Sequence, residues 1–110
     1  MANVLSTSRY KNVKLDLTTT NVTTLYTCPS LMNTFVSSLL ISEDSGNADT
    51  ITLTITAGSD VFSLFKVKAV SANTTVELLT SPLVLAESEI LKATAATANR
   101  LHVVVSDMAI

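Results

Sequence analysis

The side chains best suited to acid–base or covalent chemistry are one histidine and one cysteine. His102 as a general base would need a nucleophile or an orienting carboxylate within hydrogen-bonding reach, and the sequence alone does not place one there. Cys28 precedes Pro29 and lacks the surroundings of a reactive thiol. We therefore interpret His102 as a half-exposed strand residue and Cys28 as a small buried hydrophobe.

A cluster of oxygen-bearing side chains at residues 43–49 could in principle hold a hard cation. Glu43, Asp44 and Asp49 surround Ser45, Gly46 and Asn47, and calcium takes six to eight oxygen ligands. The spacing departs from the helix-loop-helix calcium pattern, because the alternate acidic positions and the terminal bidentate Glu are missing. A solvated loop is the favoured interpretation, with a calcium site as the alternative.

Other common catalytic and binding patterns are missing from the sequence. Two isolated glycines exclude the usual phosphate-binding loops. Glu87 and Glu89 are the closest approach to a paired-acid site for sugar chemistry, and they fall on an expected turn. There is no Trp, and Tyr10 and Tyr26 are the only Tyr, whereas carbohydrate-binding sandwiches usually expose aromatic rings. We predict no enzyme activity, no catalytic or metal-binding residues and no cofactor.

Composition limits the architecture and the partners. A chain of 110 residues suits a single domain with its own core. Because 47% of the residues are hydrophobic and only 15% charged, either the surface is largely uncharged or partner subunits cover part of it. A net charge of −2 disfavours binding to nucleic acid or anionic lipid. One Cys makes no internal disulfide, and with neither a secretory signal nor a membrane-spanning run we expect synthesis in the cytosol.

The clearest structural signal lies in residues 25–57. Ile51, Leu53 and Ile55 alternate with threonines, which is the period of a strand with one buried face. The apolar run 35–41 precedes it, separated by residues rich in Ser, Gly and Asn. These two segments together predict a β-hairpin.

Alternation elsewhere predicts more short strands. Expected strands cover residues 13–17, 22–27, 61–70, 75–79, 83–85 and 89–95, and a last strand begins at residue 101 and runs nearly to the C-terminus. In 61–70 the apolar residues change face, which predicts a bulge or a strand covered on both sides for part of its length. Residues 1–11 are polar and without period, so we expect an N-terminal arm at 1–11 and a β-domain at 12–110.

The segment 85–96 has a composition that also suits a short helix. We favour a strand there, because its length and flanking turns match those of its neighbours. With few glycines available, five asparagines are expected to supply turn conformations: Asn21, Asn33, Asn47, Asn73 and Asn99. About eight or nine short strands without a convincing long helix predict an all-β fold, an antiparallel β-sandwich of jelly-roll or Ig-like type.

Several segments in order resemble small virion structural proteins of tailed bacteriophages. They are Thr-Leu-Tyr-Thr-Cys-Pro at 24–29, Ser-Gly-Asn-Ala-Asp-Thr at 45–50, Leu-Leu-Thr-Ser-Pro-Leu-Val-Leu at 78–85 and Glu-Ile-Leu-Lys-Ala-Thr-Ala at 89–95, followed by a closing valine strand. The resemblance spans residues 22–106. Two stretches depart from it, at 30–32 and 86–89, where that family commonly has a Gly-Lys turn and Ala-Gly-Asp.

The resemblance implies a capsid decoration (cement) protein, often a homotrimer, that sits on the outside of the shell and bridges capsomers. The partners implied are the major capsid protein and copies of the chain itself, and the location is the capsid surface of the virion. A neck, tail or fibre-attachment protein is the alternative in the same class. A host-surface or carbohydrate-binding module is the alternative in another class.

Overall fold

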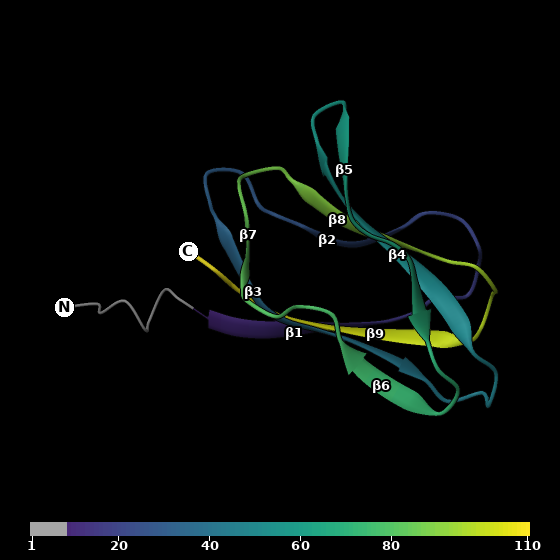
Figure 1. Ribbon diagram of the computed structural model, residues 1–110. Helices are drawn as coiled ribbons and strands as arrows, with labels where there is room; N and C mark the ends of the chain where they lie inside the picture. The colour runs from purple at the N-terminus through teal and green to yellow at the C-terminus, as the bar shows by residue number, and fades with distance from the viewer. Residues whose placement is uncertain (1–8) are drawn as a thin grey trace.

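Nine strands in two antiparallel sheets account for the fold of residues 9–110, which are the residues that the computed structural model describes. The first sheet has the order β1-β9-β3-β6, with β7 also paired to β3, and the second has the order β2-β8-β4-β5. Figure 1 shows them as two layers. The bounds are β1 Arg9–Asp16, β2 Thr23–Thr27, β3 Thr34–Glu43, β4 Asp49–Ala57, β5 Asp60–Val70, β6 Thr74–Glu77, β7 Leu83–Leu85, β8 Ile90–Ala95 and β9 Leu101–Ala109.

The pairing of the strands is nested. The first strand pairs with the last, β2 with β8, β3 with β6 and β7, and β4 with β5, all antiparallel. A long ribbon folded back on itself and rolled into two sheets gives this order, which is that of a jelly roll. The predicted β-sandwich is confirmed, and the jelly-roll form is the one adopted.

Strict alternation of residue types builds the core. Along β4, Ile51, Leu53 and Ile55 are buried, while the threonines between them are half-exposed. Val103 and Val105 on β9 face the same interior from the other sheet. The largest fully buried apolar side chains are Leu17, Leu39, Ile41, Ile51, Leu53, Leu85, Leu91 and Leu101. Burial of these side chains between the layers supplies the main stabilising free energy.

The predicted hairpin between residues 35–41 and 49–57 is wrong. β3 lies in the first sheet, where β9 takes one side and β6 and β7 the other, whereas β4 lies in the second sheet between β8 and β5. Residues 44–48 therefore cross from one layer to the other. Alternation identifies a strand with one buried face, but it does not identify the neighbour to which that strand is hydrogen-bonded.

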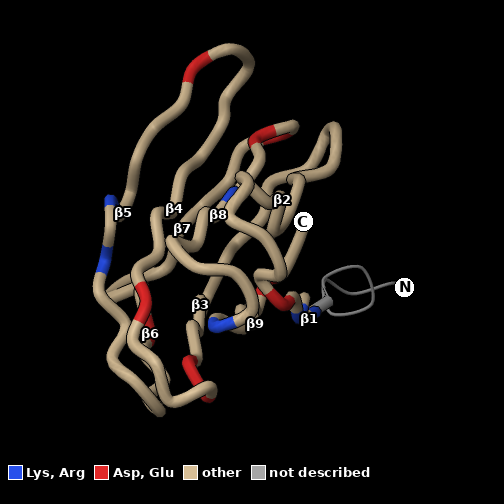
Figure 2. Tube along the Cα trace, turned by 90° about the vertical axis from the view of Figure 1, so that its right-hand side faces the viewer, with Lys and Arg blue, Asp and Glu red and all other residues tan. Residues whose placement is uncertain are grey.

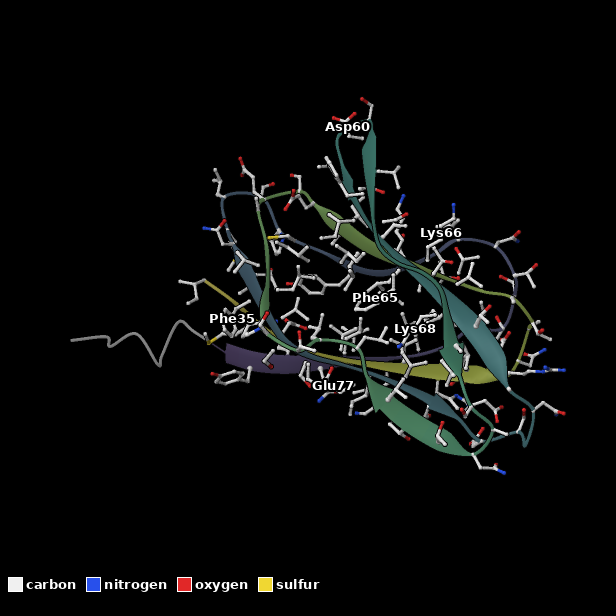
Figure 3. All side chains as sticks on the ribbon, in the orientation of Figure 1. Phe35, Asp60, Phe65, Lys66, Lys68 and Glu77 are labelled. Atoms are coloured by element: carbon white, nitrogen blue, oxygen red, sulfur yellow. The ribbon has the colours of Figure 1, made fainter. Side chains whose placement is uncertain are left out.

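The predicted bulge in 61–70 is confirmed. The β4–β5 register shifts on both sides of the Leu53–Phe65 pair. Val67 has a φ of +52°, and its N–H donates to Oγ1 of Thr52 at 3.0 Å. The bulge turns Phe65 inward, where it packs against the core (Figure 3).

Several other local predictions can be compared with the structure. The segment 90–95 is strand β8 and not a helix. Of the five asparagines, Asn73 and Asn99 have positive φ. Residues 9–11 of the expected arm belong to β1, and residues 1–8 lie outside the described part of the chain. Within residues 9–110 no helix is long and apolar enough to cross a membrane.

Candidate functional site

His102 lies between two carboxylates. Its Nδ1 contacts Oδ1 of Asp16, and its Nε2 lies 3.0 Å from Oδ1 of Asp44. Asp16 stands opposite His102 in the β1–β9 pairing, and Asp44 comes from the connection between β3 and β4. Neither carboxylate could be identified as a partner from the sequence, because Asp16 and Asp44 lie 86 and 58 positions away from His102 and only the fold brings them together.

The two carboxylates set the chemistry of the histidine. Hydrogen bonds to Asp16 and then to Asp44 raise the pKa of His102 above its ordinary value, against a smaller opposing effect of burial. Each ring nitrogen already faces a carboxylate, and no described Ser, Thr or Cys side chain is hydrogen-bonded to the ring. The arrangement suits a charged ring that clamps an edge strand to a loop, since a general base needs a free nitrogen.

Glu43, Asp44 and Asp49 each contact different groups and do not converge on one point. Glu43 is buried and accepts hydrogen bonds from the backbone N–H groups of Ser45 at 2.9 Å, Gly46 at 3.1 Å and Asn73 at 3.2 Å. Asp49 accepts from the N–H of Thr97 at 3.2 Å, and Asp44 contacts His102. Across residues 9–110 no group of three or more His, Cys, Asp or Glu side chains has a geometry that could hold a metal ion.

Hydrogen bonds lower the pKa of Glu43 to about 2, and the largest contribution comes from the Ser45 hydroxyl. The ionised carboxylate therefore organises the crossing between the two sheets. In a jelly roll this connection leaves one layer and enters the other. The Glu43 carboxylate fixes its first residues by accepting hydrogen bonds from backbone N–H groups that would otherwise lack a partner.

The remaining residues singled out in the sequence have local structural contacts. Cys28 is 1% exposed, in agreement with its interpretation as a buried hydrophobe. Glu87 accepts from the N–H of Leu31 at 2.5 Å, and Glu89 accepts from the N–H of Ala86 at 2.6 Å. The two glutamates thus each hold a different backbone segment.

A cavity of about 280 Å³ opens between the edge strands β1 and β2. Its lining residues are Lys11, Tyr26, Thr27, Pro29, Met32, Asp107 and Ala109. Asp107 is 1% exposed, and no hydrogen bond from the described residues reaches its Oδ2 atom. Alternation with Val103 and Val105 places Asp107 on the buried face of β9, but no pattern in the sequence shows that its Oδ2 atom is left without a hydrogen-bond partner.

Two apolar surfaces remain uncovered among the described residues. On the outer face of the first sheet, Tyr10, Met108, Phe35 and Val84 form a row of directly paired residues across β1, β9, β3 and β7. Tyr10 is 74% and Val84 60% exposed. A shallow groove of about 270 Å³ runs along Phe35, Val84, Met108 and Ile110. We call the four paired side chains, Tyr10, Met108, Phe35 and Val84, the outer row.

The second surface is the hairpin of β4 and β5, which projects from the body of the sandwich (Figures 1 and 3). Residues 58–59 form its two-residue turn, where Gly58 has a φ of +62° and Asp60 begins the return strand. Val61 and Phe62 are 64% and 56% exposed. Leu64 and Val67 are further exposed apolar residues along β5, and we call the four side chains, which lie on both faces of the strand, the hairpin patch.

Charges are sparse over most of the trace (Figure 2). Apart from Asp60 at the hairpin tip and Lys66 and Lys68 along β5, the projecting strand is uncharged. An edge strand that is apolar over half its length offers both side chains and unpaired backbone groups to another protein.

Comparisons with known proteins give one structural similarity. No model of a known protein family matches the chain, and no curated protein matches it. A solved structure of a pentameric capsid protein isolated from metagenomic phage sequences is 19% identical, with a TM-score of 0.43 over 99% of this chain. The match covers 62% of that protein, so this chain spans less than two thirds of its length.

Proposed function

We propose that this chain is a non-enzymatic structural protein of a bacteriophage virion, and specifically a capsid decoration protein that binds the outside of the shell and stabilises contacts between capsomers. The observation that carries the proposal is the pair of exposed apolar surfaces, the hairpin patch and the outer row. Clusters of exposed apolar side chains on a small domain are typical of surfaces that another protein covers.

The fold and the sequence support the same role. Viral capsid proteins are among the classes that use a jelly roll, although a fold alone does not fix a function. The resemblance of residues 22–106 to small phage virion proteins points to the particle. A subunit that binds only the assembled shell stabilises that shell by mass action.

The first experiment is the copy number of this chain in purified particles, measured by quantitative mass spectrometry against the major shell protein. A ratio near one, or a simple fraction of it, supports a decoration protein. A handful of copies per particle supports a neck, tail or fibre-attachment protein instead. Absence from the particle contradicts the virion proposal and favours a host-surface or carbohydrate-binding module.

The second experiment tests the hairpin patch directly. Particles without this protein are mixed with the wild-type chain or with a double variant, Phe62→Ser with Leu64→Ser, and the bound fraction is measured by sedimentation. We expect at least tenfold weaker binding for the double variant, because both side chains lose apolar contact area. Ser63→Ala, an exposed change between the two positions, is the matched control. Equal binding by all three chains would exclude the hairpin from the contact.

The arm prediction is tested in the same assay. We expect a chain that lacks residues 1–11 to bind particles more weakly, because polar termini suit contacts across a neighbouring subunit. The deletion also removes the first three residues of β1, so circular dichroism must show that the sandwich is retained. Full binding by the truncated chain would contradict the arm.

A further inference from the structure

β5 has an unpaired edge on the part of the hairpin that projects from the sandwich. It is the last strand in the order β2-β8-β4-β5, so no strand among residues 9–110 is hydrogen-bonded to its outer side. Its register with β4 is regular from Asp60 to Ser63 and shifts beyond Ser63. Bulges and lysines on an edge strand discourage pairing, and on β5 both come after residue 63. The part of the edge that can pair is therefore short and lies at the hairpin tip.

The direction of the backbone groups along this short edge follows from the hairpin turn. Asp60 closes the two-residue turn with Ala57, so Asp60 and Phe62 direct their N–H and C=O groups toward β4. Val61 and Ser63 direct theirs away from β4. An added antiparallel strand bonds to these two residues, and a second copy of β5 supplies the same two in reverse order. Val61 then faces Ser63 of the second copy, and the two Phe62 residues meet at a two-fold axis.

The charges of β5 fit this two-fold arrangement. Asp60, Phe62 and Lys68 pair with odd-numbered residues of β4, so their side chains share one face (Figure 3). Phe62 pairs with Ile55 and Lys68 with Ile51, so Lys68 lies four positions beyond Phe62 along β4. Two-fold symmetry places Asp60 of the second copy two positions beyond Phe62 on that side. Its carboxylate and the Lys68 ammonium are then diagonal neighbours, within reach of a long side chain.

A second copy is the occupant that this pattern favours. β5 carries its one carboxylate at the start and both of its amines in the second half. Antiparallel pairing of the strand with itself brings opposite charges together twice, whereas parallel pairing would align like charges. A contact made by the same residues of both subunits is the kind that two-fold dimers use. Val61 and Phe62, which are largely exposed, lose contact with water at the same place.

We propose that the tips of two β5 strands pair antiparallel across a two-fold axis at Phe62, joining two sandwiches through one sheet of order β4-β5-β5-β4. Such a contact closes as a dimer. It follows the edge of the hairpin and leaves both faces of the strand free for the shell, so the inference goes beyond the proposed function and does not depend on it. On a shell, the two subunits of the dimer would bind as one bivalent unit.

Exchange of charge between two variants tests the pairing on the full chain in solution. Asp60→Lys alone and Lys68→Glu alone each place like charges side by side in their own dimer. We expect each to dimerise about tenfold more weakly than the wild type by sedimentation velocity at low salt. An equimolar mixture of the two restores both unlike pairs, so it should dimerise as strongly as the wild type. Lys66→Glu, on the opposite face of β5, is the matched control and should have little effect (Figure 3).

A disulfide locates the two-fold axis. In an antiparallel pair without mutual hydrogen bonds the two Cα atoms lie about 4.5 Å apart, within the range that a disulfide spans. Phe62→Cys should therefore cross-link two copies rapidly under mild oxidation. Val61→Cys, similarly exposed but displaced from the axis and on the other face, should cross-link slowly. Cys28 is buried and takes no part.

Five results would overturn the inference. They are a wild-type chain that stays monomeric at millimolar concentration, a trimer in place of a dimer, single charge variants that dimerise like the wild type, a mixture as weak as its components, and equal cross-linking at residues 61 and 62. All of them are measured on the free chain. Copy number is measured on particles, so this inference and the virion proposal fail or stand separately.

Discussion

Asp16 and His102 face each other across the antiparallel pairing of the first strand with the last, and the carboxylate contacts Nδ1 of the ring. Asp44 approaches Nε2 from the crossing between the two sheets. One imidazole thus connects the edge strand β1, its neighbour β9 and the β3–β4 connection. Since both partners are acidic, the connection is strongest when the ring is charged.

This clamp predicts a stability that depends on pH. The pKa of His102 is raised in the folded state, so its stabilisation is fully present below the unfolded value of 6.5 and is lost as pH rises through the folded value. We expect the wild-type Tm to decrease by a few degrees from pH 6 to pH 9. In His102→Gln that decrease should be smaller, and its Tm at pH 6 should be below that of the wild type.

Salt provides the control for this prediction. Asp16 and Asp44 are largely exposed, at 68% and 75%, so added salt should screen much of the effect. Titration of the ring by NMR reports its pKa directly. An ordinary histidine pKa, or an equal pH dependence in His102→Gln, would show that the clamp does not form in solution.

Glu43 predicts a loss of stability in acid. Its pKa is about 2 in the folded state against 4.5 for an ordinary Glu, so its contribution is present above pH 4.5 and is lost as pH falls toward 2. We expect Glu43→Gln to lower the Tm by several degrees at pH 7 and to differ little from wild type near pH 2. Asp60→Asn, at the exposed tip of the hairpin, is the control. A constant difference across the pH range would contradict the pKa assigned to Glu43.

The core makes the simplest quantitative prediction. Leu53 is completely buried at the centre of β4, so Leu53→Ala should cost about 2–5 kcal/mol in the free energy of unfolding. Val84→Ala, at a 60% exposed position in the outer row, should change it by less than about 0.5 kcal/mol. Urea unfolding measures both. Similar effects for the two variants would contradict the layer assignment of β4.

Much of this fold could be predicted from alternation alone. The threonine-separated Ile51, Leu53 and Ile55 specify a strand and its buried face, and the face change before Phe65 indicates the bulge. The pairing of the strands could not be predicted in the same way. The link from Glu43 to Asp49 has the composition of a hairpin loop, yet it crosses between sheets, because the neighbours of β3 come from residues 74–77, 83–85 and 101–109.

The candidate surfaces also depend in part on local alternation and in part on how distant segments pack together. The exposure of Phe62 and Leu64 depends on how far the hairpin extends beyond the sandwich, which no local pattern encodes. Asp107 alternates with buried valines, so its burial follows from the period of β9, but its unsatisfied Oδ2 atom depends on the position of Lys11 on a strand from the other end of the chain.

Val67 predicts a gain in stability. A β-branched residue at a φ of +52° is strained by about 1–3 kcal/mol, whereas glycine adopts this conformation freely at an entropic cost of about 0.5–1 kcal/mol. Because Val67 is 60% exposed, Val67→Gly loses little apolar burial and should stabilise the chain by about 1 kcal/mol. Val61→Gly, at an equally exposed position of β5 without positive φ, should destabilise it. If urea unfolding showed both glycine variants destabilised to the same extent, the bulge would not hold Val67 in the left-handed region, and the inward turn of Phe65 would need another cause.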